Sequence, residues 1–176
     1  MTHESDPVDT FIAQWHREWA ELDVSPMATL GRINRISRLM APHIEQLFAD
    51  YGLERGEFDV LATLKRSGPD HRLTPTELFG ALMITSGGLT HRLKRLEKAG
   101  LVRRVPSTED RRSLLVELTE EGHEKVVAAF KQDMALEASW LEALTPDERA
   151  QLATLLRRLA KSIPAPSQGA PAQPPP

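Results

Sequence analysis

Apolar residues recur every three or four positions over most of this chain, a spacing that predicts a protein built mainly from helices. One stripe begins near Val8, a second runs from residue 26 to about residue 50, a third ends near Ser67, and a last one follows Thr145. Each stripe is expected to face a core or a partner surface. The stripe residues are Phe11, Ile12, Trp15, Trp19 and Leu22; Leu30, Ile33, Leu39, Met40, Ile44 and Leu47; Phe58, Leu61 and Leu64; and Leu152, Leu155, Leu156, Leu159 and Ile163.

The ends of these helices carry capping signals. Ser25 and Pro26 suit the N-cap and first turn of the second helix, which Pro42 is expected to kink. Thr119 precedes two glutamates and is expected to cap a further long helix, where acidic charge suits the helix dipole. Thr145 opens a capping box with a proline at the first helical position.

The pattern between residues 73 and 100 predicts two short helices joined by only a few residues. The first follows a capping box at residues 74–77 and turns Leu78, Leu82 and Phe79 to the core. The second buries a seam of leucines and ends at a glycine suited to the C′ position. The seam and the glycine are Leu89, Leu93, Leu96 and Gly100. Two such helices form a helix-turn-helix.

The outward face of the second helix is predicted to be small, polar and cationic. At about 100° per residue, the positions opposite the leucine seam carry polar or basic side chains. Ser86 is predicted as the N-cap, and the glycines after it would let the helix N-terminus approach a phosphate closely. The outward and flanking residues are Gly87, Thr90, His91, Lys94, Arg95 and Lys98.

A basic β-hairpin is predicted directly after this helix. The pattern predicts two strands, LVRRV and SLLVEL, joined by a turn over residues 106–110. The tip of this hairpin carries Arg111 and Arg112. Residues 84–112 contain eight arginines and lysines against three acidic residues, a net charge of +5, whereas the whole chain has −3. The chain therefore separates a cationic module from an acidic scaffold, which favours a nucleic-acid partner despite the acidic total.

Length and composition narrow the remaining possibilities. The chain has 176 residues, 40% of them hydrophobic, which suffices for one domain overall. The sequence indicates no signal peptide and no run of about 18 apolar residues, so a cytoplasmic location is expected. There is no cysteine, and the serine-glycine stretch matches neither a P-loop nor a dinucleotide fingerprint. The glutamates around His123 could hold a metal adventitiously, but no catalytic spacing is present. We therefore expect no enzyme activity, no cofactor and no functional metal.

The expected organisation has four segments. Residues 1–52 form N-terminal helices for a ligand pocket and dimerisation, and residues 53–118 form a winged helix-turn-helix lobe. Residues 119–163 supply C-terminal dimerisation helices, and the proline-rich residues 164–176 form a disordered tail. The fold class is thus mainly α with a small β-hairpin wing. A two-fold dimer would place two DNA-recognition helices about one DNA turn apart.

The motifs LTPTELFGAL, SGGLTHRLKRLEKAGLVRR and EDRRSLLVELTEEG, in this order, resemble the MarR family of winged-helix transcriptional regulators. The resemblance spans roughly residues 30–163. It implies a homodimer on a pseudo-palindromic operator in double-stranded DNA, usually a repressor relieved by a small ligand. It also implies that Asp110 supports the wing and that the DNA contacts come from Thr76, Ser86, Gly87, Thr90, His91, Lys94, Arg95, Arg111 and Arg112.

The additional N-terminal helix is similar to that of the urate-responsive subgroup of this family. The resemblance implies that Trp19, Asp59, Arg92 and Arg104 surround a small anionic aromatic effector such as urate. Independently, Arg92 lies about 70° from the leucine seam on the helical wheel, so it can point back into the scaffold. An arginine there suits a planar anion.

Other interpretations remain open for these residues. Trp19 could belong to the core, Asp59 could be exposed or paired with an arginine, and Arg104 could contact a DNA phosphate. The effector could be a phenolic acid related to salicylate. The whole winged helix could also be a protein-interaction module whose cationic face meets an acidic partner.

Overall fold

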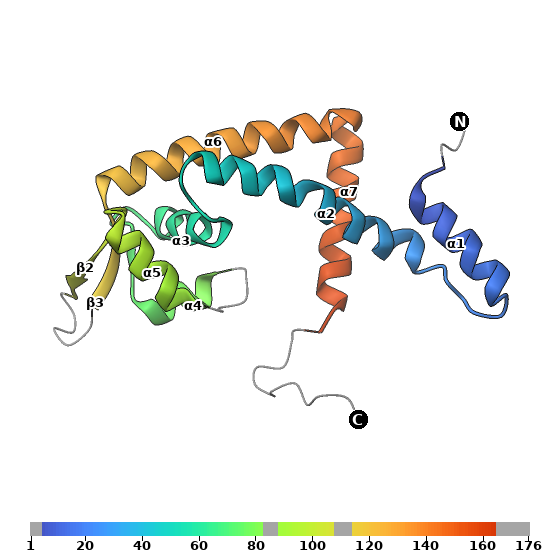
Figure 1. Ribbon diagram of the computed structural model, residues 1–176, viewed down its shortest axis with the longest axis horizontal. Helices are drawn as coiled ribbons and strands as arrows, with labels where there is room; N and C mark the ends of the chain where they lie inside the picture. Colours follow the sequence, from blue (N-terminus) through green and yellow to red (C-terminus); the bar gives the residue numbers. More distant parts are fainter. Residues whose placement is uncertain (1–4, 83–87, 108–113, 165–176) are drawn as a thin grey trace, which may run out of the picture. The chain divides into compact units, whose positions relative to one another are not determined.

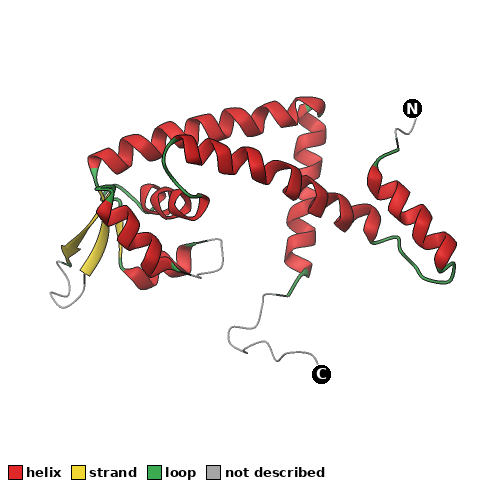
Figure 2. Ribbon diagram, viewed as in Figure 1, coloured by secondary structure: helices red, strands yellow, loops and turns green. Residues whose placement is uncertain are grey.

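The computed structural model describes residues 5–82, 88–107 and 114–164. Within these ranges the chain is mainly helical with one small antiparallel sheet (Figure 1, Figure 2). This confirms the predicted fold class. The chain divides into two compact units, residues 1–133 and 134–176, which are described separately below. None of the described helices is long and apolar enough to span a membrane.

The first two helices follow the predicted stripes, but the N-cap of the second helix is Pro26 and not Ser25, which corrects the prediction. Helix α1 spans Pro7–Glu18, and α2 spans Met27–Asp50 with Pro42 in its interior. The prediction was wrong at the end of α1, because Trp19 is the C-cap and Leu22 lies beyond the helix. These two residues therefore do not extend the helical stripe.

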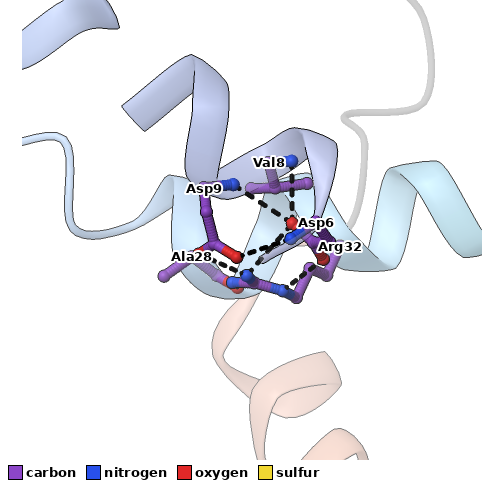
Figure 3. Close-up of polar contacts among 5 residues, drawn as sticks. All are labelled: Asp6, Val8, Asp9, Ala28 and Arg32. Carbon is purple, nitrogen blue, oxygen red and sulfur yellow. Dashed lines mark hydrogen bonds and ion pairs between the residues drawn. The ribbon is translucent and has the colours of Figure 1, made fainter. Parts of the chain in front are cut away.

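A charged network joins the start of α1 to the first turns of α2 (Figure 3). The Asp6 carboxylate caps α1 by accepting hydrogen bonds from the amides of Val8 and Asp9. The Arg32 guanidinium donates to both acidic side chains, at 2.9 Å from Asp6 Oδ2 and 2.6 Å from Asp9 Oδ1, and to the Ala28 carbonyl at 2.8 Å. Arg32 thus holds α1 on α2 with a planar fork that matches carboxylates.

Much of the apolar stripe on α1 and α2 is exposed in the single chain. In α2 only Ile44 and Phe48 are buried, and in α1 only Val8. The sequence left open whether each stripe faces a core or a partner surface; the residues at the start of α2 and on α1 do not lie in a core of this one chain. The exposed large residues are Phe11, Trp15, Trp19, Leu22, Leu30, Ile33, Ile36 and Leu39.

The core of the first unit lies around α3, which spans Arg55–Arg66. Helices α4 (Pro75–Ala81) and α5 (Leu89–Lys98) pack against α3, as do α2 and the sheet. The rings of Phe48 and Phe58 stack with centroids 4.0 Å apart. The side chains that are almost fully buried here include Leu61, Leu64, Leu78, Leu93, Leu96 and Val116.

The predicted hairpin forms the larger part of a three-stranded sheet. Strands β2 (Val102–Pro106) and β3 (Leu114–Leu118) pair antiparallel, with Arg104 opposite Val116. The two-residue strand β1 (Arg72–Leu73) pairs with the other edge of β3, so the strand order is β1-β3-β2. The sheet attaches the hairpin to α3 and α4.

The two C-terminal helices begin where the caps were predicted. Helix α6 spans Glu120–Trp140, and Thr119 Oγ1 accepts from the Gly122 amide at 3.1 Å. A short 3₁₀ turn follows, and α7 spans Pro146–Ser162 behind the capping box of Thr145. None of the residues of α7 is buried, and its apolar stripe is exposed at Leu152, Leu155, Leu156 and Ile163.

Candidate functional site

Helix α5 starts later than the sequence suggested. Its N-cap is Gly88, whose φ of 90° is a left-handed conformation that favours glycine. Ser86 is therefore not the N-cap, which corrects the prediction. Ser86 and Gly87 lie before the helix and outside the described residues, so their expected DNA contacts stay predictions. At the other end, Gly100 follows the C-cap with φ 73°, as expected for a C′ glycine.

The leucine seam fixes which side of α5 faces outward. Leu89, Leu93 and Leu96 are all buried, as the periodicity predicted. As a consequence, Thr90, His91, Lys94 and Lys98 are exposed. The exposed face of α5 is therefore polar and cationic along its length, which suits a polyanionic partner.

A shallow groove lies where α4 meets the start of α5. Its volume is about 400 Å³, and it is lined by Pro75, Thr76, Phe79, Gly88, Leu89 and Thr90. Thr76 is exposed in the first turn of α4. Phe79 was predicted to be in the core, but 47% of its surface is exposed because Leu78 takes the inward position of this short helix.

Arg95 binds two carboxylates at the start of α3. Its guanidinium pairs with Glu54, and its Nε lies 2.8 Å from Glu57 Oε1, whose side chain is buried. Both glutamates also take part in the capping box of α3. Arg95 therefore anchors α5 to α3 in this structure, and this positioning role was not apparent from the sequence.

The wing is described only at its base. Asp110, Arg111 and Arg112 lie outside the described residues, so their expected roles stay predictions. In the described strands, Arg103 Nε lies 2.8 Å from Glu117 Oε2, and the pairing with Glu117 raises the pKa of Arg103. This pair fixes one arginine across β2 and β3.

Arg92 points back toward the scaffold, as the helical wheel predicted. Its guanidinium lies directly on Gly56 of α3: a Cβ placed at that glycine would be 2.3 Å from Arg92 Cζ and 2.7 Å from Nη2. Only a residue without a side chain permits so close an approach. Sequence reasoning missed Gly56, and its one signal was a glycine in the first turn of a helix that is otherwise well formed.

Asp59 lies in the same region as Arg92. Burial raises the pKa of the Asp59 carboxyl, while the charges of Arg55, Arg92 and Arg66 act in the opposite direction. Asp59 Oδ2 and Arg92 Nη1 are both buried, and neither has a hydrogen-bond partner within the described residues. The structure thus brings together two of the four residues expected around an effector and leaves one polar atom of each unsatisfied.

The other two expected effector residues lie elsewhere. Trp19 is at the end of α1, a helix that packs on α2, and 54% of its surface is exposed. Arg104 on β2 forms an ion pair with Glu97 of α5. Neither of these contacts involves Asp59 or Arg92, so the ligand role of Trp19 and Arg104 stays a prediction.

One further buried acid was not singled out from the sequence. Asp133 of α6 is only 7% exposed, and its Oδ1 atom has no hydrogen-bond partner in the described structure. Burial raises its pKa, Arg55 lowers it, and Asp59 raises it further. An aspartate on a long amphipathic helix carries no sequence signal for burial, because most such residues face solvent. Among the described residues, no group of three or more acidic or histidine side chains is placed to hold a metal.

Comparisons with known proteins agree on one family. The MarR family profile matches residues 53–114. The transcriptional regulator PecS of Dickeya dadantii is 37% identical over 156 residues, covering 89% of this chain and 94% of PecS. Among solved structures, AbsC, a MarR family regulator from Streptomyces coelicolor, matches with a TM-score of 0.69 and 26% identity, covering 80% of this chain and 95% of AbsC.

A DNA complex is among the similar structures. A point mutant of MarR from Escherichia coli, solved with operator DNA, matches with a TM-score of 0.64 and 27% identity over 78% of this chain and 95% of that one. These similar proteins are transcriptional regulators, which confirms the expectation that the chain is not an enzyme.

Proposed function

Because the chain belongs to the MarR family of winged-helix transcriptional regulators, we propose that it represses transcription as a homodimer and is released from its operator by a small anionic aromatic ligand such as urate. The observation that carries the DNA half of the proposal is the exposed cationic face of α5. The buried leucine seam leaves His91 and Lys94 outward, and the β2–β3 wing follows directly. This is the geometry in which a recognition helix enters a major groove.

Within that face, the residues take different roles. Thr90, His91 and Lys94 would approach the bases, with Thr76 of α4 and the arginines of the wing tip contacting the phosphate backbone or the minor groove. Arg95 would act indirectly, since its ion pairs with α3 hold α5 at a fixed orientation. The operator-bound structure of Escherichia coli MarR supports this use of the fold.

Two exposed apolar surfaces support the proposed dimer. Most stripe residues of α1 and of the N-terminal half of α2 are exposed, and so are most of those of α7. Large apolar patches on a single chain mark surfaces that associate. A two-fold pair of chains would cover them and present two α5 helices to one pseudo-palindrome.

The ligand half of the proposal rests on Asp59 and Arg92. Arg92 is fixed on Gly56 with an unsatisfied donor, and the planar guanidinium is suited to an aromatic anion. An anion bound there comes close to Asp59, and repulsion between the like charges would move α3 relative to α5. The ligand acts only through its different affinity for the two dimer geometries, with a coupling of typically about 1–3 kcal/mol.

The DNA half is tested with the promoter region that precedes the chain's own gene. Lys94→Ala is expected to weaken binding in a fluorescence anisotropy titration and to lower the slope of log affinity against log salt by about one. Lys131→Ala removes the same charge from an exposed position on α6 and serves as the control. Binding that does not depend on salt, or no binding, would contradict DNA recognition and favour a protein-interaction module.

The ligand half is tested with urate added to the protein–operator complex. Urate is expected to release the DNA from the wild-type chain but not from Arg92→Ala, with circular dichroism confirming that the variant is folded. Arg92→Lys keeps the positive charge but replaces the planar guanidinium, with its several donors, by an ammonium, and this variant is expected to respond only weakly to urate. A response to salicylate in place of urate would assign the effector to the phenolic acids. An unchanged operator affinity at millimolar urate would refute the urate proposal.

A further inference from the structure

The polar site around Asp59 has an additional member on α6. The charge of Asp59 acts on the Asp133 carboxyl, and Arg55 of α3 acts on both carboxyls. Asp133 is more than nine-tenths buried, and its Oδ1 atom has no hydrogen-bond partner within the described structure. Asp133 is therefore a buried residue of α6 whose carboxyl lies within range of the Asp59 charge.

Three of the four buried side-chain atoms that lack a hydrogen-bond partner in the described structure belong to Asp59, Arg92 and Asp133, and the fourth is Nδ1 of His71 beside β1. More than nine in ten buried polar groups in proteins have a hydrogen-bond partner, since leaving one without a partner is unfavourable. Here Asp59 Oδ2, Arg92 Nη1 and Asp133 Oδ1 come from three different helices and are all unsatisfied in the described structure. Two are acceptors and one is a donor, so the set is complementary to a ligand that carries both donors and acceptors.

The arrangement of the three groups is fixed by the fold. The Arg92 guanidinium lies against Gly56 of α3, the Asp59 carboxyl is on the same helix, and the buried Asp133 of α6 lies within range of the charges of Arg55 and Asp59. Burial raises the pKa of both carboxyls, and Arg55, Arg66 and Arg92 are the positive charges that act on Asp59. The charges of the site are thus mixed, which suits a ligand that is itself both acceptor and donor.

We propose that Asp133 is a ligand-contacting residue that accepts a hydrogen bond from a ring N–H of a purine-type anion, while Arg92 donates to an oxygen of the same molecule. This inference rests on the proposed ligand response and adds a specificity determinant to it. Urate has ring N–H groups beside its carbonyl oxygens. Salicylate has no ring N–H, and its one donor, the phenolic hydroxyl, is adjacent to its carboxylate, so a hydrogen bond to Asp133 would bring two carboxylates close together. Asp133 therefore selects N–H-bearing heterocycles over aromatic acids.

Calorimetric titration of the full-length chain with urate and with salicylate tests this role. Asp133→Leu removes the acceptor at similar volume and is expected to weaken urate binding at least tenfold, while salicylate binding changes less than threefold or tightens. Asp133→Asn keeps one acceptor oxygen and is expected to lose less urate affinity than Asp133→Leu. Asp147→Asn, at an exposed position of α7, is the matched control and is expected to bind urate as the wild type does.

Thermal unfolding separates a ligand contact from a structural role. Removing a buried, unsatisfied carboxylate is expected to raise the melting temperature, so weaker urate binding in a more stable protein supports the proposal. Urate affinity unchanged in Asp133→Leu but lost in Arg92→Ala would overturn it and leave the proposed function intact. Equal losses for urate and salicylate, or a lowered melting temperature, would also overturn it. Urate binding independent of Arg92 would instead refute the proposed function, and this inference with it.

Discussion

Gly56→Ala is the substitution that tests the proposed ligand site most directly. A methyl group at this position would lie 2.3 Å from Arg92 Cζ and 2.5 Å from Nε, whereas ordinary contacts between such atoms are about 3.5–4 Å. The atoms in the way are the far end of a flexible side chain, so the guanidinium must move by roughly 1 Å or more while α3 keeps its path. The charge of Arg92 is retained, and only its position changes.

The expected magnitudes follow from this geometry. Alanine in place of glycine within a helix stabilises a protein by up to about 1 kcal/mol, and the lost packing of Arg92 offsets part of that gain. We therefore expect the free energy of unfolding to change by less than about 1 kcal/mol. Loss of a well-placed hydrogen bond from a charged group costs about 1.5–3 kcal/mol, which weakens urate binding by roughly 10- to 100-fold.

The assay compares three properties of the same protein. Denaturant unfolding reports stability, anisotropy reports operator affinity without ligand, and a urate titration reports the ligand affinity. Gly56→Ala is expected to keep its stability, to bind the operator with an affinity within about threefold of the wild type, and to lose most of the urate response. Gly80→Ala is the matched control, since a Cβ on that helical glycine would meet no atom within 4 Å.

Two results would refute this reasoning. An unchanged urate affinity in Gly56→Ala would show that the contact between Arg92 and Gly56 of α3 plays no part in ligand binding. A loss of stability of several kcal/mol would show that α3 and α5, rather than the arginine side chain, had to move apart.

Three further predictions concern the contacts that shape the fold. Burial raises the pKa of Asp133 above 3.8, so the folded state holds this proton more tightly than the unfolded chain, and the carboxyl destabilises the fold as pH rises through its folded pKa. Asp133→Asn should therefore raise the free energy of unfolding by about 1–3 kcal/mol at neutral pH and by much less near pH 3. Urea unfolding at the two pH values measures the difference. Arg95→Ala leaves the buried Glu57 without its ion pair and should lower the free energy of unfolding by about 1–3 kcal/mol, and Arg95→Lys should restore part of that stability. An unchanged urea midpoint in Arg95→Ala would contradict the anchoring role. Arg32→Ala should reduce the hydrogen-exchange protection of the α1 amides at least tenfold with little change in α3, whereas equal loss in both helices would contradict a local role.

The local signals of the sequence predicted most of the elements correctly. The capping boxes at Thr74 and Thr145, the cap at Thr119 and the glycine after α5 all occur where the sequence indicated. These features depend on a few neighbouring residues, so their physics is contained in a short window. The prediction failed at Ser86, because a glycine adopting a left-handed backbone starts α5 two residues later and no side-chain signal specifies that choice.

The apolar stripes were identified correctly as apolar, but periodicity alone could not say what covers them. Leu93 and Leu96 are buried in the chain itself, whereas Trp15 and Leu155 are exposed. A stripe indicates which side of a helix must associate, and the identity of the covering surface depends on the tertiary and quaternary arrangement.

By itself, the sequence determined the helices, the hairpin, the leucine seam of α5 and hence the family. The tertiary structure alone decided that Arg95 pairs with Glu57, that Arg92 rests on Gly56 and that Asp133 is buried on α6. These contacts join residues that are distant in sequence, so they follow from how α3, α5 and α6 pack rather than from any local pattern. That packing also joins Arg92 and Arg95 of α5 to α3 while it leaves Lys94 exposed.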